Sequence, residues 1–241
     1  MTETFPAPPW RGDGKPRRRL DRESIGREAL RIIDAEGIDA VSMRRVAAEL
    51  DAGTMTLYHY VRTKDELVAL MDDAIMGELL IPDDELPSDW REALTAIARR
   101  TRDAFARHPW SLYPLGEAQI GPNAMRHVEQ SVGAVAELDL GLAASFEIVG
   151  LVDEYVFGHA MRGHDTGPVA PEARERWLEQ VTEYMEAEIA TGDYPHLAAL
   201  VPEGGMVAAW EQLQESEAAE DRFERGLKRL LDGIELDLKN R

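Results

Sequence analysis

Apolar residues recur at intervals of three and four along most of the chain, and this spacing is the strongest constraint on its fold. Ile25, Ala29, Ile32 and Ile33 begin the pattern, and residues 223–238 repeat it near the C-terminus. Such spacing places apolar side chains on one face of an α-helix. The two-residue alternation of a half-buried strand is not sustained anywhere, so we predict an all-α fold with roughly nine or ten helices.

We expect the chain to consist of three parts. Prolines and glycines are concentrated in the first 19 residues, a composition that disfavours helices and strands. We therefore expect a flexible basic arm over residues 1–20, a first helical domain over 21–67 and a second helical domain over 68–241. The first domain contains helices that are short and closely spaced, whereas the second contains longer ones.

The composition also excludes several classes of protein. The chain has no cysteine, which excludes a disulfide scaffold, a Cys-ligated metal site and a thiolate nucleophile. The longest apolar stretch, 146–161, is interrupted by Glu147, Asp153 and Glu154, so we expect no membrane span and no membrane partner. Residues 1–10 lack the basic start and apolar core of a secretory signal. The expected location is the cytoplasm.

Charge is distributed unevenly between the two ends of the chain. Residues 1–64 contain 12 basic and 10 acidic side chains, whereas the remainder contains 15 and 36 and has a net charge of −21. A basic segment on an acidic body is a candidate for contacting a polyanion at one controlled place. Arg17, Arg18 and Arg19 form the centre of that segment. They are either phosphate contacts or part of a solvated tail, and charge alone does not choose between these interpretations.

Residues 42–61 have the pattern of a helix-turn-helix. Ser42 to Leu50 is the expected supporting helix, and Thr54 to Tyr60 is the expected recognition helix after a break at 51–53. A helix of this size fits the major groove of DNA, where its N-terminal residues meet base edges. Leu57 and Val61 are four residues apart and are expected to face inward. The residues expected to face outward are Thr54, Met55, Tyr58 and His59.

The residues that follow strengthen this prediction. Thr63 and Glu66 have the spacing of a capping box, which would begin the next helix. Lys64 lies at this cap, where its ammonium could meet a phosphate. An exposed methionine and aromatic rings are unusual on a purely solvated face, but they suit thymine methyl groups and the sugar-phosphate edge.

Residues 42–50 and 56–67, which read SMRRVAAEL and TLYHYVRTKDEL, resemble the DNA-binding domain of TetR-family transcriptional repressors. The resemblance covers about residues 21–70. Asp51 departs from the family, which usually has glycine in this turn, although aspartate tolerates a left-handed backbone better than most residues. The second domain, through its segments 107–110 and 223–227, is similar to the tetracycline-repressor-like subgroup.

The resemblance implies a set of DNA contacts. Arg44 is the candidate for a direct guanine contact, because its planar fork matches O6 and N7. Tyr60 has a second interpretation, which is local packing against the preceding helix. The implied contacts are Met43, Arg44, Thr54, Met55, Thr56, Tyr58, His59, Tyr60 and Lys64.

Metal and catalytic sites are not expected. The six histidines show no pair with metal-ligand spacing. The tetracycline repressor uses a histidine after its fifth helix to hold drug-bound magnesium, and the corresponding segment 113–116 has none. No serine has the flanking pattern of a nucleophile, and no glycine-rich phosphate loop is present, so we predict that the chain is not an enzyme and needs no cofactor.

The long apolar helix expected over 142–161 has two interpretations, namely ordinary core or dimer packing, and the wall of a ligand cavity. The family resemblance implies both, with one face lining a cavity and another packing against a second subunit. Candidate cavity walls come from three predicted helices and a short segment at the mouth. The candidate residues are Ile97, Thr101, Phe105, Trp110, Tyr113, Met125, His127, Val128, Ser131, Val132, Phe146, Val149, Gly150 and Asp153.

Asp153 is the unusual member of this set because it interrupts an apolar face. A buried carboxylate without a partner is unfavourable by several kcal/mol. Asp153 is therefore expected to face water in a cavity, to pair with a residue such as His127, or to lie at a subunit interface. The helices over 142–161 and 223–238 are expected to pair with their two-fold mates as a four-helix bundle.

We conclude from the sequence that the protein is a homodimeric repressor that binds a palindromic double-stranded DNA operator. A small, largely apolar effector is expected to release it. The alternative is a helical small-molecule sensor or partner-binding module that does not bind an operator. The basic segment and the surface between Arg44 and Lys64 favour the first interpretation.

Overall fold

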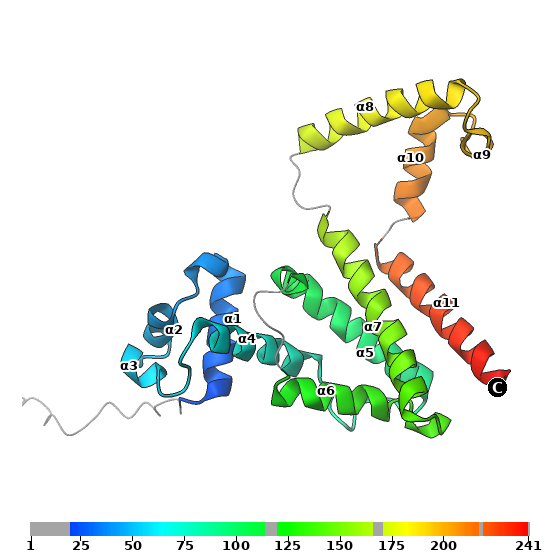
Figure 1. The fold of residues 1–241 in the computed structure, drawn as a ribbon. Coiled ribbons are helices and arrows are strands. Elements are labelled where there is room, and N and C mark those ends of the chain that lie inside the picture. Colours follow the sequence, from blue (N-terminus) through cyan, green and yellow to red (C-terminus); the bar gives the residue numbers. More distant parts are fainter. Residues whose placement is uncertain (1–19, 114–119, 166–170, 217–218, 241) are drawn as a thin grey trace, which may run out of the picture. The chain divides into compact units, whose positions relative to one another are not determined.

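The computed structural model describes residues 20–113, 120–165, 171–216 and 219–240, and every regular element in these ranges is helical (Figure 1). The predicted all-α class is therefore confirmed. Short 3₁₀ turns cover Ile38–Ala40, Pro109–Leu112 and Ala136–Leu138. The α-helices are α1 (Arg22–Glu36), α2 (Met43–Glu49), α3 (Thr54–Leu57), α4 (Lys64–Leu79), α5 (Trp90–Arg107), α6 (Pro122–Gly133), α7 (Leu142–Asp165), α8 (Pro171–Ala190), α9 (Pro195–Ala198), α10 (Gly205–Ser216) and α11 (Ala219–Lys239).

Local sequence signals explain where the principal helices begin and end. The Asp21 side chain accepts from the Ser24 backbone N–H at 2.7 Å, and the Ser24 hydroxyl in turn accepts from the Asp21 backbone, so α1 begins with a reciprocal cap. Gly37 ends α1 with a positive φ of 85°, a conformation that glycine adopts without steric cost. The Asp89 side chain caps α5 by accepting from the backbone N–H groups of Arg91 and Glu92.

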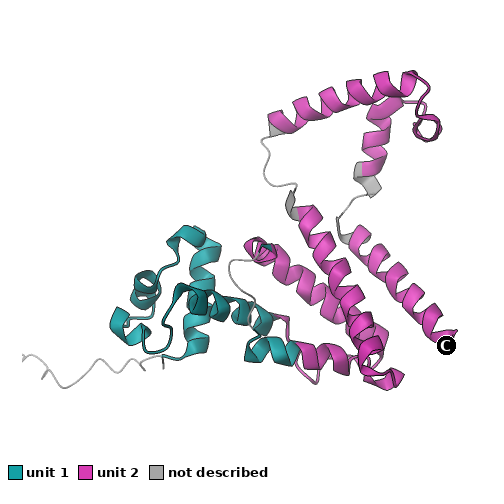
Figure 2. Ribbon diagram, viewed as in Figure 1, with its two compact units in different colours: residues 1–78, 113–127 teal, residues 79–112, 128–241 magenta. Residues whose placement is uncertain are grey.

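The chain separates into two compact units (Figure 2). Unit 1 comprises residues 1–78 and 113–127, and unit 2 comprises residues 79–112 and 128–241. The two helical domains expected from the sequence meet at residue 67, which lies inside α4. That boundary stays a prediction.

Within unit 1, α1 crosses α4 at very short range. A Cβ atom on Gly26 would lie 2.4 Å from the backbone oxygen of Leu70. Only a residue without a side chain permits this approach. Ile25, Ile32 and Met71 are buried beside this contact and form part of the core of the unit.

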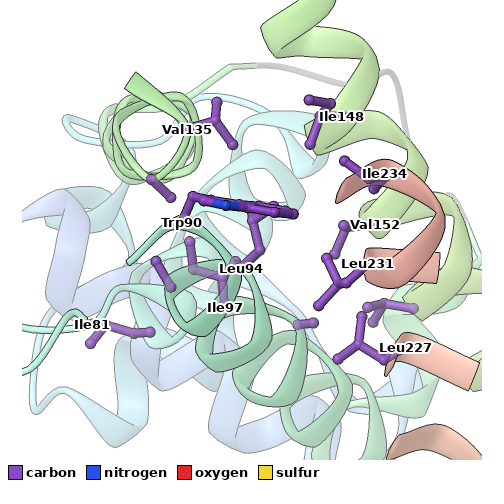
Figure 3. Packing of buried hydrophobic residues seen from close by; sticks show 14 of the residues in the cluster. Ile81, Trp90, Leu94, Ile97, Val135, Ile148, Val152, Leu227, Leu231 and Ile234 are labelled. Carbon is purple, nitrogen blue, oxygen red and sulfur yellow. The ribbon is translucent and has the colours of Figure 1, made fainter. Parts of the chain in front are cut away.

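The core of unit 2 is built by α5, α7 and α11 (Figure 3). The indole of Trp90 lies among aliphatic side chains from all three helices and from the segment around Val135. Polar contacts add to this packing: the Tyr155 hydroxyl donates to the Phe223 carbonyl at 2.9 Å. The Arg102 guanidinium lies 4.7 Å from the centre of the Phe223 ring, a cation–π arrangement.

Ion pairs join the outer faces of α5 and α11. Arg91 contacts both Asp232 and Glu235, and Arg99 binds Glu224 through two nitrogens at 2.7 and 2.8 Å. Bidentate pairs of this kind fix geometry as well as contributing attraction. The α5–α11 packing is therefore specified by charge at its rim and by apolar contacts inside.

Prolines and glycines are concentrated in residues 195–205, a composition typical of a break, but residues 205–216 form the regular helix α10. Gly205 begins this helix at a positive φ, and the Met206 backbone N–H donates to Glu186 at 3.2 Å. The Trp210 indole donates to the Thr182 hydroxyl at 2.8 Å, which holds α10 against α8. The prolines mark the ends of helices rather than the absence of one.

Helix α6 ends at Gly133, and a separate 3₁₀ turn follows it at Ala136–Leu138. In α11, Phe223, Leu227 and Ile234 are buried in the core of their own unit. These side chains pack inside the subunit, and the expected pairing of the helix over 223–238 with its two-fold mate stays a prediction. Helical spacing identifies an apolar face but does not identify what covers it.

Candidate functional site

The helix-turn-helix has the predicted arrangement. The Ser42 hydroxyl accepts from the Arg45 backbone N–H at 3.2 Å and begins α2. Asp51 has a φ of 50°, so the turn adopts the left-handed conformation that the family usually gives to glycine. Leu57 and Val61 are fully buried, as predicted. The turn therefore keeps its shape without glycine.

The predicted recognition helix is shorter than expected. Helix α3 ends at Leu57, and residues 58–60 continue as turns closed by bonds such as Tyr60 N–H to the Leu57 carbonyl at 2.9 Å. The bonds of this segment mix spans of three residues, such as Tyr60 to Leu57, with spans of four, such as Val61 to Leu57. Met55, Tyr58 and His59 remain exposed although the helix is shorter.

Three of the four residues predicted to face outward, Met55, Tyr58 and His59, are exposed. Met55 is 76% exposed, and Thr56, Tyr58 and His59 are also exposed. Thr54 is partly covered. Met43 and Tyr60 are half-buried, so each combines packing with a limited exposed edge. An exposed methionine beside a phenol ring presents an apolar surface to any partner that covers α3.

Two adjacent arginines on α2 have different surroundings. Arg45 binds Glu36 at 2.7 Å and also contacts Glu49, and these bonds raise the pKa of its guanidinium. Arg44 is exposed and forms no hydrogen bond or ion pair with any described residue. Of the two, Arg44 has the guanidinium that is available to a partner.

The segment after α3 adds a basic residue that sequence reasoning did not select. The side chains of Arg62 and Lys64 are both exposed and have no acidic partner among the described residues. Its position between the recognition turn and the cap of α4 could have identified Arg62 as a candidate contact. Arg17, Arg18 and Arg19, predicted to contact DNA, lie outside the described residues.

The cap of α4 differs in one bond from the predicted box. The Thr63 hydroxyl accepts from the Glu66 backbone N–H at 3.1 Å, as expected. The Glu66 carboxylate, however, accepts from the backbone of Arg62 at 2.8 Å instead of Thr63. The return bond reaches one residue further back because the chain enters α4 from a tight turn. This bond fixes the backbone that carries Arg62.

The predicted cavity residues in unit 2 fall into a buried group and an exposed group. Ile97 belongs to the hydrophobic core, and Val149 and Phe105 pack against it. Val132, Gly150 and Trp110 are half-buried. Phe146, Val128 and Asp153 are exposed. The prediction therefore mixed core positions with surface positions, because spacing does not reveal which stripe of a helix is covered.

Thr101 and Ser131 are the buried polar members of this group. Their side chains are 7% and 2% exposed, and neither hydroxyl oxygen has a hydrogen-bond partner among the described residues. A buried hydroxyl without a partner is destabilising by about 1–3 kcal/mol. Such an atom in a native protein requires an explanation, and a bound molecule is one.

The Asp153 side chain contacts solvent, yet the pKa of its carboxyl is raised. Its side chain is exposed. Surrounding protein atoms nevertheless raise its pKa from 3.8 to about 6 by desolvation. It forms no ion pair or hydrogen bond with the described residues. The carboxyl is therefore available to bind a proton or to accept a hydrogen bond from a group outside the chain.

The remaining predicted cavity residues belong to unit 1. Met125 and Tyr113 are exposed, whereas His127 is half-buried. The Nδ1 atom of His127 has no hydrogen-bond partner among the described residues, and desolvation lowers the pKa of its imidazole. The neutral ring is therefore favoured at this position.

Two regions of the chain match known protein families. Residues 25–71 match the family described as "Bacterial regulatory proteins, tetR family". Residues 82–238 match the family described as "Tetracyclin repressor-like, C-terminal domain". The chain belongs to the TetR family. Its α2–α3 pair is accordingly the DNA-binding helix-turn-helix of a TetR-family transcriptional regulator.

Several relatives agree with this membership along nearly the whole chain. The transcriptional repressor DrrR1 of Streptomyces coeruleorubidus is 36% identical over 237 residues, which is 95% of this chain and 81% of DrrR1. A transcriptional regulator of Saccharopolyspora erythraea is 30% identical over 220 residues, 89% of this chain and 84% of that protein. These TetR-family relatives are regulators of transcription and not enzymes.

A solved structure gives the same result. Apo ActR from Streptomyces coelicolor matches with a TM-score of 0.66 at 27% identity, covering 92% of this chain and 97% of ActR. ActR in complex with actinorhodin matches with the same TM-score at 28% identity, covering 90% of this chain and 96% of that protein. The TetR-family fold thus extends through both compact units.

In the described part of this TetR-family chain, no group of three histidine, aspartate or glutamate side chains is arranged to hold a metal ion. None of the described helices combines the length and apolar character needed to span a bilayer.

Proposed function

We propose that the protein is a homodimeric repressor that binds a near-palindromic operator through α2 and α3 and is released by a small, largely apolar effector. The observation that carries the DNA-binding part is the contrast between Arg44 and Arg45. Arg45 is neutralised by Glu36 and Glu49, whereas Arg44 is exposed and unpaired among the described residues. A free guanidinium beside a recognition helix is suited to guanine or phosphate.

The surface of α3 supports the same proposal. Met55 and Tyr58 present apolar surface that no described residue covers, and thymine methyl groups and sugar edges would cover it in a major groove. Arg62 and Lys64 flank this surface and are placed to contact phosphates. Residues 1–19 would add affinity that does not depend on sequence and falls as salt rises.

The outer face of α7 and α11 supports a dimer. Leu151 is exposed there and lines a shallow hollow of about 490 Å³ between the helices. Gly150 and Gly233 have open space where a Cβ would be, so another helix can approach closely. The same face on a two-fold mate would complete a four-helix bundle, with the two recognition helices about 34–36 Å apart.

The effector part of the proposal rests on unsatisfied polar groups beside apolar surface. Thr101 and Ser131 offer two buried hydroxyls that lack partners, and Asp153 offers a carboxyl with a raised pKa. We infer an apolar molecule with a few hydrogen-bonding groups. A strongly anionic molecule is disfavoured by the net charge of −21 on residues 65–241. The relative ActR binds actinorhodin, which supports a small-molecule effector here.

The DNA-binding proposal is tested by selecting an operator from a pool of random duplexes and measuring affinity at fixed salt. Arg44→Ala is expected to weaken binding by about 1–3 kcal/mol, or roughly 5- to 150-fold. Arg45→Ala is the matched control and is expected to change affinity much less, because its charge is already paired. Wild-type affinity in Arg44→Ala would contradict the assignment.

The effector site is tested separately with compounds that release the parent protein from the selected operator. Val149→Trp is expected to abolish release while leaving operator binding intact, because the indole would fill space beside the apolar core. Asp153→Leu is expected to change which compounds act. If both variants respond like the parent, the effector binds elsewhere. A protein that selects no duplex would instead support a sensor without operator binding.

A further inference from the structure

Unit 1 contains an open cavity of about 720 Å³ that the proposed function does not use. Its lining residues come from the start of α1, from the turn at Tyr60, from one face of α4 and from residues 120–126 at the start of α6. All of them belong to unit 1. The volume lies within the range of about 300–1,000 Å³ that is usual for pockets that bind small molecules.

Helix α4 contributes one continuous stripe of side chains to this cavity. Ala69, Leu70, Asp73 and Ala74 lie three, four, seven and eight positions after Glu66, which is the spacing of a single helix face. Glu66 and Asp73 are half-buried. The α4 wall therefore carries two carboxylates, with small and aliphatic side chains between them.

Each of these two carboxylates uses one oxygen within the fold. Glu66 Oε2 accepts from the Arg62 backbone N–H at 2.8 Å, and Asp73 Oδ1 accepts from the backbone N–H groups of Asn123 at 2.9 Å and Ala124 at 3.2 Å. The other oxygen of each carboxylate accepts no hydrogen bond from a described residue. Both side chains are thus held in position and retain acceptor capacity for a donor in the cavity.

The other charged residues of the lining leave the cavity negative. Asp21 and Glu23 add two carboxylates, whereas Arg22 and Arg126 are the basic residues of the described lining, so its formal charge is −2. The Arg22 side chain is already bound to the Tyr60 carbonyl, and Arg126 is exposed to solvent. A negative and partly apolar cavity favours a cation that carries an apolar body.

We propose that this cavity binds a small organic cation, in which an amidinium, guanidinium or alkylammonium group is attached to an apolar body. Glu66 and Asp73 accept its hydrogen bonds, and a planar amidinium can donate two to one carboxylate. Leu70 and the two alanines of α4 contact the apolar body. Tyr60 supplies an aromatic ring, a group that attracts cations to its face. The site is separate from the effector position proposed in unit 2.

The test is a titration of the full chain without DNA, followed by the amide chemical shifts of residues 66–74 and 120–126. The probes are benzamidine, benzamide and benzoate, which have nearly the same shape but are cationic, neutral and anionic. Benzamidine is expected to bind at least about tenfold more tightly than benzamide, because its hydrogen bonds to carboxylates are charge-assisted. Equal affinities for benzamidine and benzamide, or shifts confined to unit 2, overturn the proposal.

Glu66→Gln separates the charge of Glu66 from its structural bond. Glutamine keeps an oxygen that can accept from the Arg62 N–H, but its neutral amide attracts a cation less. Benzamidine binding is expected to weaken by about fivefold or more. Asp65→Asn is the matched control, since Asp65 is adjacent on α4 and absent from the lining, and it is expected to change affinity by less than about twofold. A Glu66→Gln protein with wild-type affinity overturns the proposal.

Two further variants keep the test decisive if Glu66→Gln does not fold. Ala69→Trp places an indole in the cavity and is expected to abolish binding of benzamidine. Arg126→Gln removes a positive charge from the lining and is expected to tighten binding by about twofold. An Ala69→Trp protein that binds benzamidine normally, or weaker binding by Arg126→Gln, contradicts the assigned site.

The basic segment of the chain carries the same guanidinium chemistry as the proposed ligand. Arg17, Arg18 and Arg19 precede the first lining residue by a few positions in the sequence. The full chain with all three changed to glutamine is expected to bind benzamidine within about twofold of the wild type. Binding that appears only in this triple variant would show that the chain's own arginines occupy the cavity, and would overturn a site for a free ligand.

Discussion

The Nε atom of Arg22 donates a hydrogen bond to the backbone carbonyl of Tyr60 across 3.1 Å. This bond joins the first residue of α1 to the end of the turn that follows α3. The recognition turn is therefore anchored on one side by buried Leu57 and Val61 and on the other by a charged donor from α1.

We predict that Arg22→Ala weakens operator binding by about 0.5–1.5 kcal/mol, the ordinary contribution of one hydrogen bond. Arg22→Lys keeps the charge but loses the Nε donor, so it separates anchoring from attraction to phosphate. Arg27→Ala, which removes an exposed pair with Glu23 on the same helix, is the control. Fluorescence anisotropy with the selected operator measures all three, and equal affinities for Arg22→Ala and the wild type would remove the anchoring role.

Gly26→Ala is expected to destabilise unit 1. Its Cβ would lie 2.4 Å from the Leu70 backbone oxygen, so α1 and α4 would have to separate. Overpacking of this kind reduces stability by about 1–3 kcal/mol. Gly163→Ala in α7 has open space around it and is expected to gain up to about 1 kcal/mol from helix propensity. Chemical denaturation distinguishes the two, and a Gly26→Ala protein as stable as the wild type would contradict the close crossing.

Asp153 is expected to make stability depend on pH. Its pKa is raised from 3.8 to about 6 in the folded protein, so the folded state holds the proton more tightly than the unfolded state. Stability from the protonated form is then present below pH 4 and is lost as the pH rises through 6. Asp153→Asn should be more stable than the wild type above pH 6, by less than about 1 kcal/mol because the side chain contacts solvent.

Urea unfolding between pH 4 and 8 measures this effect of Asp153→Asn. The two proteins are expected to converge in stability toward pH 4 and to separate above pH 6. Glu154→Gln, an exposed neighbour on the same helix, controls for the general loss of one negative charge. Parallel curves for Asp153→Asn and the wild type would show that the environment of Asp153 does not perturb its carboxyl.

Leu151→Glu is expected to dissociate the proposed dimer. Leu151 lines the hollow between α7 and α11, and two-fold symmetry would place two new carboxylates in one interface. We expect the dimer dissociation constant to rise by more than about 100-fold. Ile120→Glu changes an equally apolar, 76% exposed residue outside α7 and α11 and should leave the dimer intact. Sedimentation at micromolar protein provides the measurement, and an unchanged Leu151→Glu dimer would place the interface elsewhere.

The sequence by itself determined the helical class, the helix-turn-helix and the exposed residues of α3 and of the turn that follows it. These features depend on local information, because caps, helical spacing and turn residues act over fewer than about five positions. Asp51 shows the strength of this information: its tolerance of a left-handed backbone was inferred from residue type and is realised at a φ of 50°. The family resemblance agreed with these inferences at residues 42–67.

Only the tertiary structure decided how equivalent side chains differ in their surroundings. Arg44 and Arg45 are adjacent and identical in type, yet the fold brings Glu36 to Arg45 and leaves Arg44 unpaired among the described residues. Asp73 and Asn123 meet across 50 positions, a pairing that no local pattern encodes. Burial and long-range contact depend on which helix faces pack together, and helical spacing defines those faces without defining their partners.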